Sequence, residues 1–234
     1  MSLAPTVAAL ARTTIFGSLD EAALHRVADE SVGASYHPGA VVFAQGDPGD
    51  CLYVVTSGRL KLQVRTRGLD TLMLTTLRAP DTFGELAVID RGPRSATVVA
   101  LEPSTLLAVD RSTVLALLSD LPEVTDALLR GLGATVRRLT EQAADLALLD
   151  LTGRVAKLLV TLGDQQLAPG SDDAAADQVL ELRLTQTDMA QMVGGTRQSV
   201  NQILSGFAAR GLIEVRGRTI VLRRPADLRR RAGL

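Results

Sequence analysis

The chain has 234 residues, of which 46% are hydrophobic and 22% charged, and its formal net charge is −1. This composition predicts an ordinary soluble globular protein with enough apolar residues for two hydrophobic cores. No apolar run approaches the roughly 20 residues that cross a bilayer, and no basic stretch precedes an apolar block at the N-terminus, so we expect a cytoplasmic protein. Cys51 is the single cysteine, which excludes an internal disulfide and a four-thiolate iron–sulfur cluster from one chain. We expect Cys51 to be a small buried core residue, with a redox role as the alternative.

The N-terminal half is predicted to be mostly β-structure. Residues 6–31 have the apolar spacing of short helices, and from about residue 33 to residue 110 short β-branched runs alternate with turn residues such as Pro38, Gly39 and Gly58. Regular spacing of this kind predicts an antiparallel sandwich or barrel. The expected strands are residues 41–43, 52–55, 60–64, 72–77, 96–101 and 106–109.

A candidate anion site follows the fourth expected strand, in the segment FGELAVIDRGPRSAT at residues 83–97. Gly84 allows close approach of the backbone to a ligand, and the next amides could open a short helix that favours an anion. Arg94 and Ser95 would donate to the same phosphate, and the Glu85 carboxylate suits a ribose hydroxyl. Each feature alone is weak, since such a glycine is usually a turn and such an arginine usually lies at the surface. The candidate residues are Gly84, Glu85, Leu86, Ala87, Arg94 and Ser95.

The period changes to that of a helix between residues 111 and 150. After Pro122, two interleaved series of apolar residues repeat every seven positions, which predicts a long helix that pairs with a second copy of itself. The alternative is that this helix packs on its own β domain, and both can hold because Leu128, Ala147 and Leu148 lie outside the seam. The expected seam residues are Leu129, Val136 and Ala143 at a positions and Leu132, Leu139 and Leu146 at d positions.

Three residues, Thr152, Gly153 and Arg154, are expected to mark a break before a helix at residues 155–162. Beyond that helix, residues 168–177 are predicted to form an exposed polar loop.

Two helices joined by a glycine turn are predicted at residues 184–204. Thr185 can cap the first helix in a capping box with Asp188. Gly194 and Gly195 are expected to supply the positive φ values of a tight helix exit, after which Thr196 can cap the second helix.

The second helix is predicted to bury one apolar stripe and to leave a polar face for DNA. Arginine can donate two hydrogen bonds to guanine, and Gln or Asn can pair with adenine, so this face suits the major groove. The alternative is an ordinary helical hairpin with a polar outer face. The buried stripe is expected to be Val200, Ile203, Leu204 and Phe207, and the polar face Arg197, Gln198, Asn201, Gln202 and Ser205.

The C-terminal segment combines a hairpin with a local excess of positive charge. Residues 212–215 and 219–222 are two β-prone runs joined through Arg216, Gly217 and Arg218, as in a basic wing. From residue 197 onward nine arginines face two acidic residues, so this segment carries 9 − 2 = +7 and residues 1–196 carry −8. Such localised basicity is typical of phosphate binding. The arginines at positions 229–231 could either contact DNA or form a solvated helix.

These segments resemble, in the same order, four parts of the cyclic-AMP receptor protein (CRP/FNR) family of bacterial transcriptional regulators. GDPGDCLYVVTSGRLKL at residues 46–62 resembles that family's β-roll, FGELA with PRSAT its nucleotide site, LDLTGRVA at residues 149–156 its hinge, and residues 184–222 its winged helix-turn-helix. The resemblance implies an α+β fold with an antiparallel N-terminal β-roll, a long dimerisation helix and a winged C-terminal domain. It also implies boundaries at residues 1–120, 121–150 and 151–234.

By this resemblance the anion site would hold the ribose and phosphate of a cyclic nucleotide, cyclic AMP above all, and no metal or covalent cofactor is implied. Two family features are altered. Where family members of the cyclic-AMP-responsive type have Thr and Ser against the adenine, this chain has Leu139 and Thr140, of which only Thr140 can hydrogen-bond a base. Where the best-known members read bases with Arg, Glu and Arg, this chain has Arg197, Gln198 and Gln202, which shifts one preference from cytosine toward adenine.

The resemblance predicts a homodimeric, non-enzymatic regulator that binds a palindromic operator in double-stranded DNA, contacts RNA polymerase and responds allosterically to the nucleotide. The expected DNA contacts are Thr185, Thr196, Arg197, Gln198, Ser199, Asn201, Gln202, Arg216 and Arg218. Three alternatives remain open: the same architecture with another effector such as haem or with none, the regulatory module of an enzyme, and a purely architectural DNA binder. His37, before Pro38 at a strand start, is expected to be exposed rather than a haem ligand.

Overall fold

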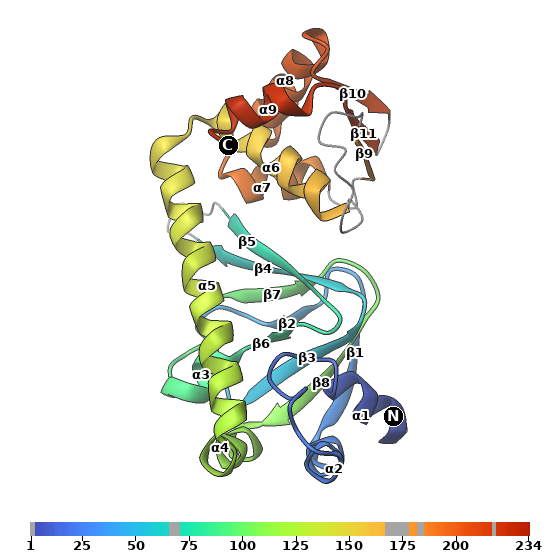
Figure 1. The fold of residues 1–234 in the computed structure, drawn as a ribbon, viewed down its shortest axis with the longest axis vertical. Helices are drawn as coiled ribbons and strands as arrows, with labels where there is room; N and C mark the ends of the chain where they lie inside the picture. The colour runs from blue at the N-terminus through green and yellow to red at the C-terminus, as the bar shows by residue number, and fades with distance from the viewer. Residues whose placement is uncertain (1–2, 66–70, 167–177, 182–184, 217–218) are drawn as a thin grey trace. The chain divides into compact units, whose positions relative to one another are not determined.

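The computed structural model describes residues 3–65, 71–166, 178–181, 185–216 and 219–234. The chain divides into two compact units, Met1–Arg137 and Arg138–Leu234, and the boundary falls within the long helix α5, Pro122–Leu148. The unit containing the N-terminus and the unit containing the C-terminus are labelled element by element in Figure 1.

The N-terminal unit is built on two four-stranded antiparallel sheets with the orders β1-β8-β3-β6 and β2-β7-β4-β5. Their strands are β1 Val32–Tyr36, β2 Val41–Phe43, β3 Cys51–Ser57, β4 Arg59–Arg65, β5 Thr71–Arg78, β6 Thr82–Phe83, β7 Thr97–Ala100 and β8 Ser104–Asp110. Four short helices accompany them: α1 Leu3–Leu10, α2 Glu21–Glu30, α3 Glu85–Asp90 and α4 Arg111–Asp120.

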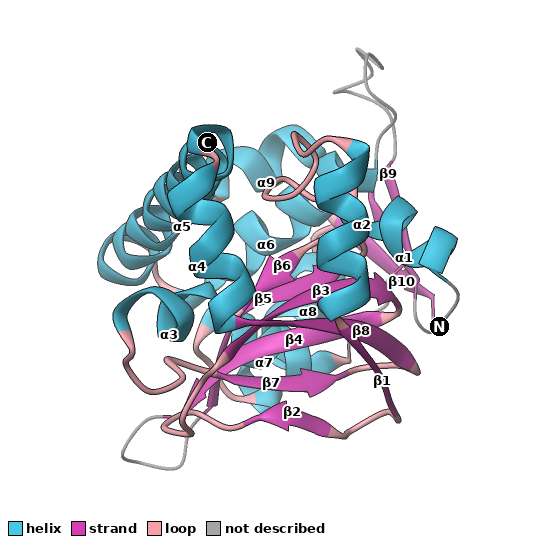
Figure 2. Ribbon diagram, turned by 90° about the horizontal axis from the view of Figure 1, so that it is seen from below, coloured by secondary structure: helices cyan, strands magenta, loops and turns pink. Residues whose placement is uncertain are grey.

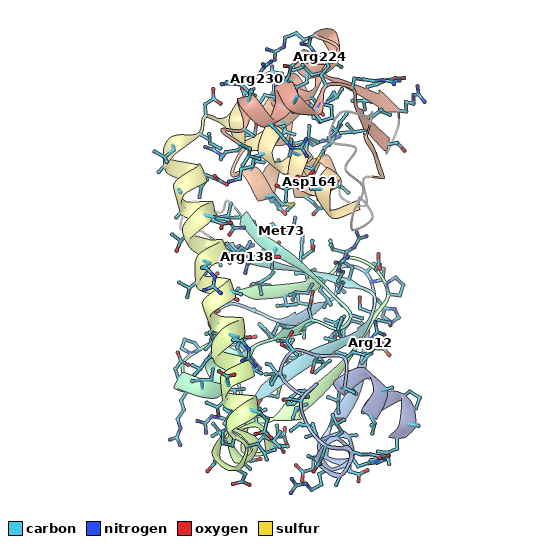
Figure 3. The ribbon with its side chains drawn as sticks, viewed as in Figure 1. Arg12, Met73, Arg138, Asp164, Arg224 and Arg230 are labelled. Atoms are coloured by element: carbon cyan, nitrogen blue, oxygen red, sulfur yellow. The ribbon has the colours of Figure 1, made fainter. Side chains whose placement is uncertain are left out.

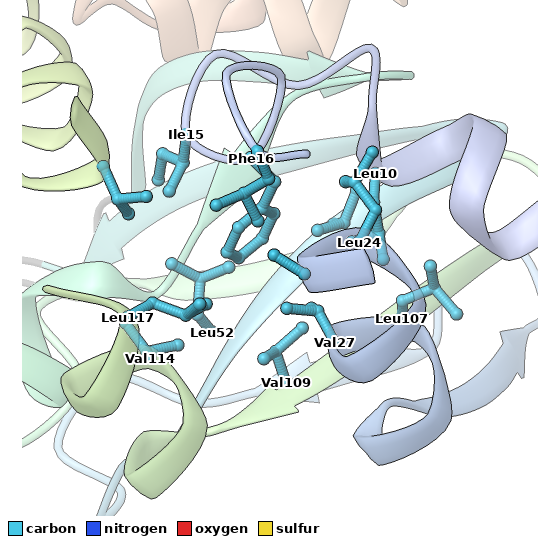
Figure 4. Packing of buried hydrophobic residues seen from close by; sticks show 14 of the residues in the cluster. Leu10, Ile15, Phe16, Leu24, Val27, Leu52, Leu107, Val109, Val114 and Leu117 are labelled. Carbon is cyan, nitrogen blue, oxygen red and sulfur yellow. The ribbon is translucent and has the colours of Figure 1, made fainter. Parts of the chain in front are cut away.

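Strand β3 contributes to two cores because neighbouring side chains point to opposite faces of a sheet. Leu52 and Val54 face the cluster formed with α1, α2 and α4, whereas Val55 joins the cluster between the two sheets. Strand β8 repeats the pattern, with Leu107 toward the helices and Leu106 toward the other sheet. Figure 2 shows α2 and α4 over one face of the β3–β8 sheet, and Figure 4 shows the apolar side chains that meet there.

All six strands expected from the sequence are present, as are the two N-terminal helices. Two further strands, β1 and β6, were not anticipated. Strand β1 has the sequence VGASY, whose small residues lack a β signal, and it is a sheet edge whose residues are at most half-buried. Strand β6 has only two residues and is fixed by its pairing with β3 rather than by local propensity.

The fully buried residues of helix α5 lie in its first turns. Val124 and Leu128 belong to the cluster formed with α2 and α4, Ala127 between them is buried as well, and Leu132 packs partly against the same cluster. Leu148, at the other end, is 82% exposed. The alternative that this helix packs on its own β domain is therefore correct for the first turns, whereas most residues of the later turns are exposed or partly buried in the single chain.

The C-terminal unit contains α6 Leu151–Gln166, β9 Gln178–Glu181, α7 Gln186–Val193, α8 Arg197–Ala209, β10 Ile213–Arg216, β11 Thr219–Leu222 and α9 Pro225–Arg231. The strands form an antiparallel sheet of order β10-β11-β9. One core joins all the helices of this unit, and its largest fully buried side chains are Phe207, Leu159, Met189 and Ile220.

One sequence expectation here is wrong. The expected break between helices does not lie at residues 152–154, because these residues form part of the first turn of α6. The break lies at Leu149 and Asp150, between α5 and α6. The Asp150 carboxylate accepts a hydrogen bond from the Gly153 amide at 2.7 Å, which starts the helix there. The expected polar loop at residues 168–177 lies outside the described residues.

The Phe207→Ala substitution tests this C-terminal core. Because Phe207 is fully buried, its truncation should lower the free energy of unfolding by about 3–5 kcal/mol, from lost apolar burial and the cavity left behind. Chemical denaturation measures the change. Leu148→Ala is the control, since removal of such an exposed side chain should cost less than about 0.5 kcal/mol, and an equal loss in both variants would contradict the assigned core.

Candidate functional site

The predicted anion site is a turn between β6 and α3. Gly84 begins the turn with φ +85°, in the left-handed region that favours glycine. A Cβ atom at this position would lie 2.6 Å from Nη1 of Arg94, so a side chain is excluded by space as well as by conformation. The structure therefore gives Gly84 a positive φ and close contact with Arg94, whereas the predicted approach of a ligand to this backbone stays a prediction.

Arg94 is the centre of the site. Its side chain is only 4% exposed, and it donates from Nη1 to the Gly84 carbonyl and from Nη2 to the Cys51 carbonyl, both at 2.8 Å. The guanidinium also lies over the Phe43 ring, 4.3 Å from its centroid, and 5.6 Å from that of Tyr53. These contacts fix the position of the positive charge before any ligand is bound.

The charge of Arg94 forms no direct ion pair with a carboxylate in the described part of the chain, although the Glu85 carboxyl group is near enough to interact with it. The Nε of Arg94 is buried and finds no hydrogen-bond acceptor among the described residues. The Nε lies against Gly49, where a Cβ atom would come within 2.6 Å of it. A guanidinium carries five N–H donors, so hydrogens remain for a further acceptor after the two carbonyls are satisfied.

Glu85, the first residue of α3, is the acidic member of the site. Burial raises the pKa of its carboxyl group, and the nearby Arg94 charge acts against that rise. The other predicted members divide between surface and interior: Leu86 and Ser95 are exposed, whereas Ala87 is buried. The structure therefore brings Gly84, Glu85 and Arg94 together.

Sequence reasoning missed the residues that hold Arg94 from behind. Phe43 and Tyr53 are 5.7 Å apart between ring centroids and lie on strands of different sheets, so no local pattern connects them with Arg94. Cys51 is buried, as expected, and its sulfur lies 3.6 Å from Nη2 of Arg94. Burial raises the pKa of the Cys51 thiol, which disfavours the thiolate that a redox role requires.

Most of the predicted dimer seam is exposed on α5. Leu129 and Val136 are 60% and 62% exposed, and Leu139, Ala143 and Leu146 are also exposed. Leu132 is the exception, because it packs partly against the core of the N-terminal unit. Thr140, the predicted base contact, is likewise exposed on α5 and belongs to the C-terminal unit.

The helix-turn-helix has the predicted caps. The Thr185 hydroxyl accepts from the Asp188 amide at 3.1 Å, and the Asp188 carboxylate accepts from the Thr185 amide at 3.0 Å, which completes the capping box. Thr196 accepts from the Ser199 amide at 3.1 Å and caps α8.

The two turn glycines serve different purposes. Gly194 has a positive φ of 64°, as expected, but Gly195 does not have one. A Cβ atom at Gly195 would instead lie 2.8 Å from a methyl carbon of Leu151 on α6. The second glycine therefore permits close packing of the turn on α6, and the positive φ predicted for it is wrong.

Helix α8 separates its buried and polar faces as predicted. Val200, Leu204 and Phe207 are buried, and Ile203 packs partly against the same core. The opposite face lines an open hollow of about 630 Å³. Arg197, Gln198, Gln202 and Ser205 are exposed there, with Asn201 half-buried beside them.

Several of the arginines after α8 form ion pairs with acidic residues of the same unit. In the hairpin, Arg216 is exposed and pairs with Glu214, whereas Arg218 lies outside the described residues. In the tail, Arg229 pairs with Asp164 of α6, Arg230 and Arg224 with Asp227, and Arg231 with Asp150 (Figure 3 labels Asp164, Arg224 and Arg230). These ion pairs favour a structural role for the tail over a DNA contact.

The described residues contain no cluster of three or more His, Cys, Asp or Glu side chains that could hold a metal ion. None of their helices has the length and apolar character needed to span a membrane. His37 is exposed, as expected from its place before Pro38.

Two family models cover most of the chain. Residues 34–120 match the model described as "Cyclic nucleotide-binding domain", and residues 153–231 match the "Crp-like helix-turn-helix domain". The first match includes Arg94 and its supports, and the second includes both helices of the helix-turn-helix, the hairpin and α9.

Curated relatives match over nearly the full length. A "CRP-like cAMP-activated global transcriptional regulator" of Mycobacterium tuberculosis is 34% identical over 223 residues, which is 95% of this chain and 98% of the relative. A "Cyclic AMP receptor protein" of Thermus thermophilus is 34% identical over 196 residues, 82% of this chain and 84% of that one.

Solved structures agree on the fold. The c-di-GMP responsive global regulator CLP of Xanthomonas campestris has a TM-score of 0.74 at 25% identity, covering 87% of this chain and 99% of its own. The fold is therefore an N-terminal nucleotide-binding-type β-roll, a long helix and a C-terminal winged helix-turn-helix. The relatives are transcriptional regulators rather than enzymes. Together, the two domain matches in this order and the full-length relatives show that the chain belongs to the CRP/FNR family of bacterial transcriptional regulators.

Proposed function

We propose that the protein is a homodimeric, cytoplasmic, non-enzymatic transcription factor whose affinity for an operator is controlled by a cyclic nucleotide, cyclic AMP above all. Residues 1–120 would bind the nucleotide, residues 121–150 would dimerise, and residues 151–234 would bind DNA. The observation that carries the proposal is the buried Arg94 guanidinium, which lies beside Gly84 and Glu85 without a direct ion pair among the described residues, in a chain that also exposes the polar face of α8.

The site offers complementary groups to a cyclic phosphate and its ribose. The fixed positive charge of Arg94 attracts the phosphate, with the exposed Ser95 hydroxyl as a second donor. The Glu85 carboxylate accepts a hydrogen bond from a ribose hydroxyl. Two relatives that match nearly or most of the chain have cyclic AMP in their names, which supports that nucleotide as the effector.

The base would be recognised differently from the adenine in the cyclic-AMP-responsive members. Leu139 offers only an apolar surface, so among the two expected positions Thr140 alone could hydrogen-bond a base. This difference favours a second candidate, the same switch with another nucleotide as effector. The c-di-GMP responsive regulator among the structural neighbours is a precedent for that variety.

The exposed seam supports dimerisation through α5. Apolar side chains at a and d positions along one helix face gain free energy when a second helix covers them. Exposed leucine and valine side chains along this helix face would otherwise stay largely in contact with water, as Leu129, Val136 and Leu146 do in the single chain.

A two-fold dimer would present two copies of α8 to successive major grooves. Half-sites of a palindromic operator should then lie about 34 Å apart, one turn of duplex. Arg197 would select guanine, and Gln198 and Gln202 would favour adenine. Nucleotide binding would shift the population of dimers toward the spacing that matches DNA, and RNA polymerase would be the partner at the promoter.

Replacing Arg94 tests the nucleotide site. In Arg94→Gln the fixed charge is lost, and calorimetric titration with cyclic AMP should show an affinity loss of at least about tenfold, equivalent to 1.4 kcal/mol. Because Arg94 also satisfies two buried carbonyls, the variant should lose about 1–3 kcal/mol of stability, and its melting curve must be recorded alongside. Arg91→Gln is the matched control: the same charge is removed from an exposed residue three positions away, without change in binding. Equal affinities for Arg94→Gln and the wild type would refute the site. Parallel titrations with cyclic GMP and cyclic di-GMP decide between effectors.

A charge in the seam tests the dimer. Leu129→Glu places a carboxylate where about 1.5–3 kcal/mol of leucine burial is expected in each subunit, so the dissociation constant from sedimentation equilibrium should rise at least about tenfold. Ala134→Glu puts the same charge on an exposed position away from the seam and should leave the constant unchanged. A stable dimer in both variants would place the interface elsewhere.

Arg197→Ala tests base reading. Removing a bidentate contact to guanine should cost about 1–3 kcal/mol, and only on operators with that guanine. Binding to a set of single-base operator variants measures the loss. Arg210→Ala, at the other end of α8, should weaken binding equally on every sequence or leave it unchanged. A uniform loss for Arg197→Ala would show that its guanidinium contacts phosphate only.

A further inference from the structure

The C-terminal helix α9 ends against the start of α6, as Figure 1 shows for the C-terminal unit. Leu228 and Ala232 are buried in the same core as Val155 and Ala156 of α6. A Cβ atom at Gly153 would lie 3.2 Å from the carbonyl oxygen of Arg231, so the helix end touches the first turn of α6 directly.

Asp150 connects the chain's end with the junction of α5 and α6. One carboxylate oxygen accepts from the Gly153 amide at 2.7 Å and thereby caps α6, and the other accepts from the Arg231 guanidinium. The hydrogen bond from Gly153 and the Arg231 charge lower the pKa of the Asp150 carboxyl group. The same carboxylate is therefore both the helix cap and the anchor of α9.

The junction is also held from its other side. Arg154 donates from Nη1 to the Leu149 carbonyl and from Nε to the Val193 carbonyl, both at 2.8 Å. Val193 ends α7, immediately before the turn that leads into α8, and that turn packs on Leu151 through Gly195. The six residues 149–154 thus lie between the C-terminus and the helix-turn-helix.

We propose that Arg231 is a positioning residue: through Asp150 it fixes the direction in which α6 leaves the dimerisation helix, and the C-terminal helix thereby transmits the effector signal to α8. This inference rests on the proposed function. Without this contact, α6 could leave α5 in several directions, and α8 would adopt several orientations. Nucleotide binding would then raise DNA affinity less. An exposed ion pair stabilises a protein little by itself. This ion pair orients the carboxylate that caps α6, so its loss should weaken the capping hydrogen bond of the junction backbone.

Neighbouring arginines provide a matched control. Arg230 pairs with Asp227 inside α9 and does not reach the junction. Arg231→Ala and Arg230→Ala therefore remove the same charge from the same helix, at adjacent positions, and differ in the contact with Asp150. Asp150→Asn completes the set, because an asparagine oxygen can still cap α6 while the ion pair is lost.

The experiment has two readouts on the full-length protein. The first is amide hydrogen exchange without ligand: the Gly153 and Arg154 amides should exchange at least about threefold faster in Arg231→Ala and Asp150→Asn than in the wild type or Arg230→Ala. The second is the factor by which cyclic AMP raises operator affinity, which should be at least about threefold smaller in the same two variants.

Unchanged amide exchange in Arg231→Ala and Asp150→Asn overturns the proposal, whatever the effect of cyclic AMP on operator affinity. Faster exchange with an undiminished effect of cyclic AMP shows that the contact is a local cap only, and this also overturns it. If cyclic AMP and the other nucleotides leave the wild type's operator affinity unchanged, the proposed function itself fails, and the inference with it. The positioning role of Arg231 fails by itself only if cyclic AMP raises the operator affinity of the wild type and either readout contradicts the proposal.

Discussion

A buried positive charge that forms no direct ion pair with a described carboxylate is the constraint on which the N-terminal unit depends. Moving a guanidinium out of water costs several kcal/mol unless hydrogen bonds and polarisable neighbours replace the lost hydration. Here the Gly84 and Cys51 carbonyls and the Phe43 ring replace part of it. Both sheets and the segment before α3 must therefore be in place for Arg94 to be buried at all.

The same constraint explains the glycines around the site. Gly84 and Gly49 both lie where a Cβ atom would collide with the Arg94 side chain. They lie more than thirty residues apart in the sequence. Gly49 lies just before β3, and Gly84 directly follows β6. Glycine at both positions therefore leaves room for the wide Arg94 side chain.

Much of this architecture could be predicted from the sequence, because its signals are local. Thr185 with Asp188, Thr196, and the apolar spacing of α8 identify two capped helices without reference to the rest of the chain. The supports of Arg94 could not be predicted, since Phe43 and Tyr53 lie on strands of different sheets and meet only after folding. The break expected at residues 152–154 is misplaced for a related reason: glycine lowers helix propensity, but Gly153 lies in the first turn of α6, close to the Arg231 carbonyl oxygen of α9. Gly195 was likewise assigned a backbone role when its role is packing against Leu151. The sequence also showed nine arginines after residue 196 without showing that several of them pair with acidic residues of the same unit.

Helix α8 has one face buried in the core and one exposed polar face, so the two faces can change independently in evolution. Val200, Leu204 and Phe207 maintain the fold of the C-terminal unit, whereas Arg197, Gln198 and Gln202 contribute almost nothing to that core. Exposed helical positions tolerate most substitutions at a cost within about 0.5 kcal/mol. Under the proposed function, a lineage could therefore exchange the residues on this outer face, and with them the set of promoters that it recognises, while the protein remains as stable as before.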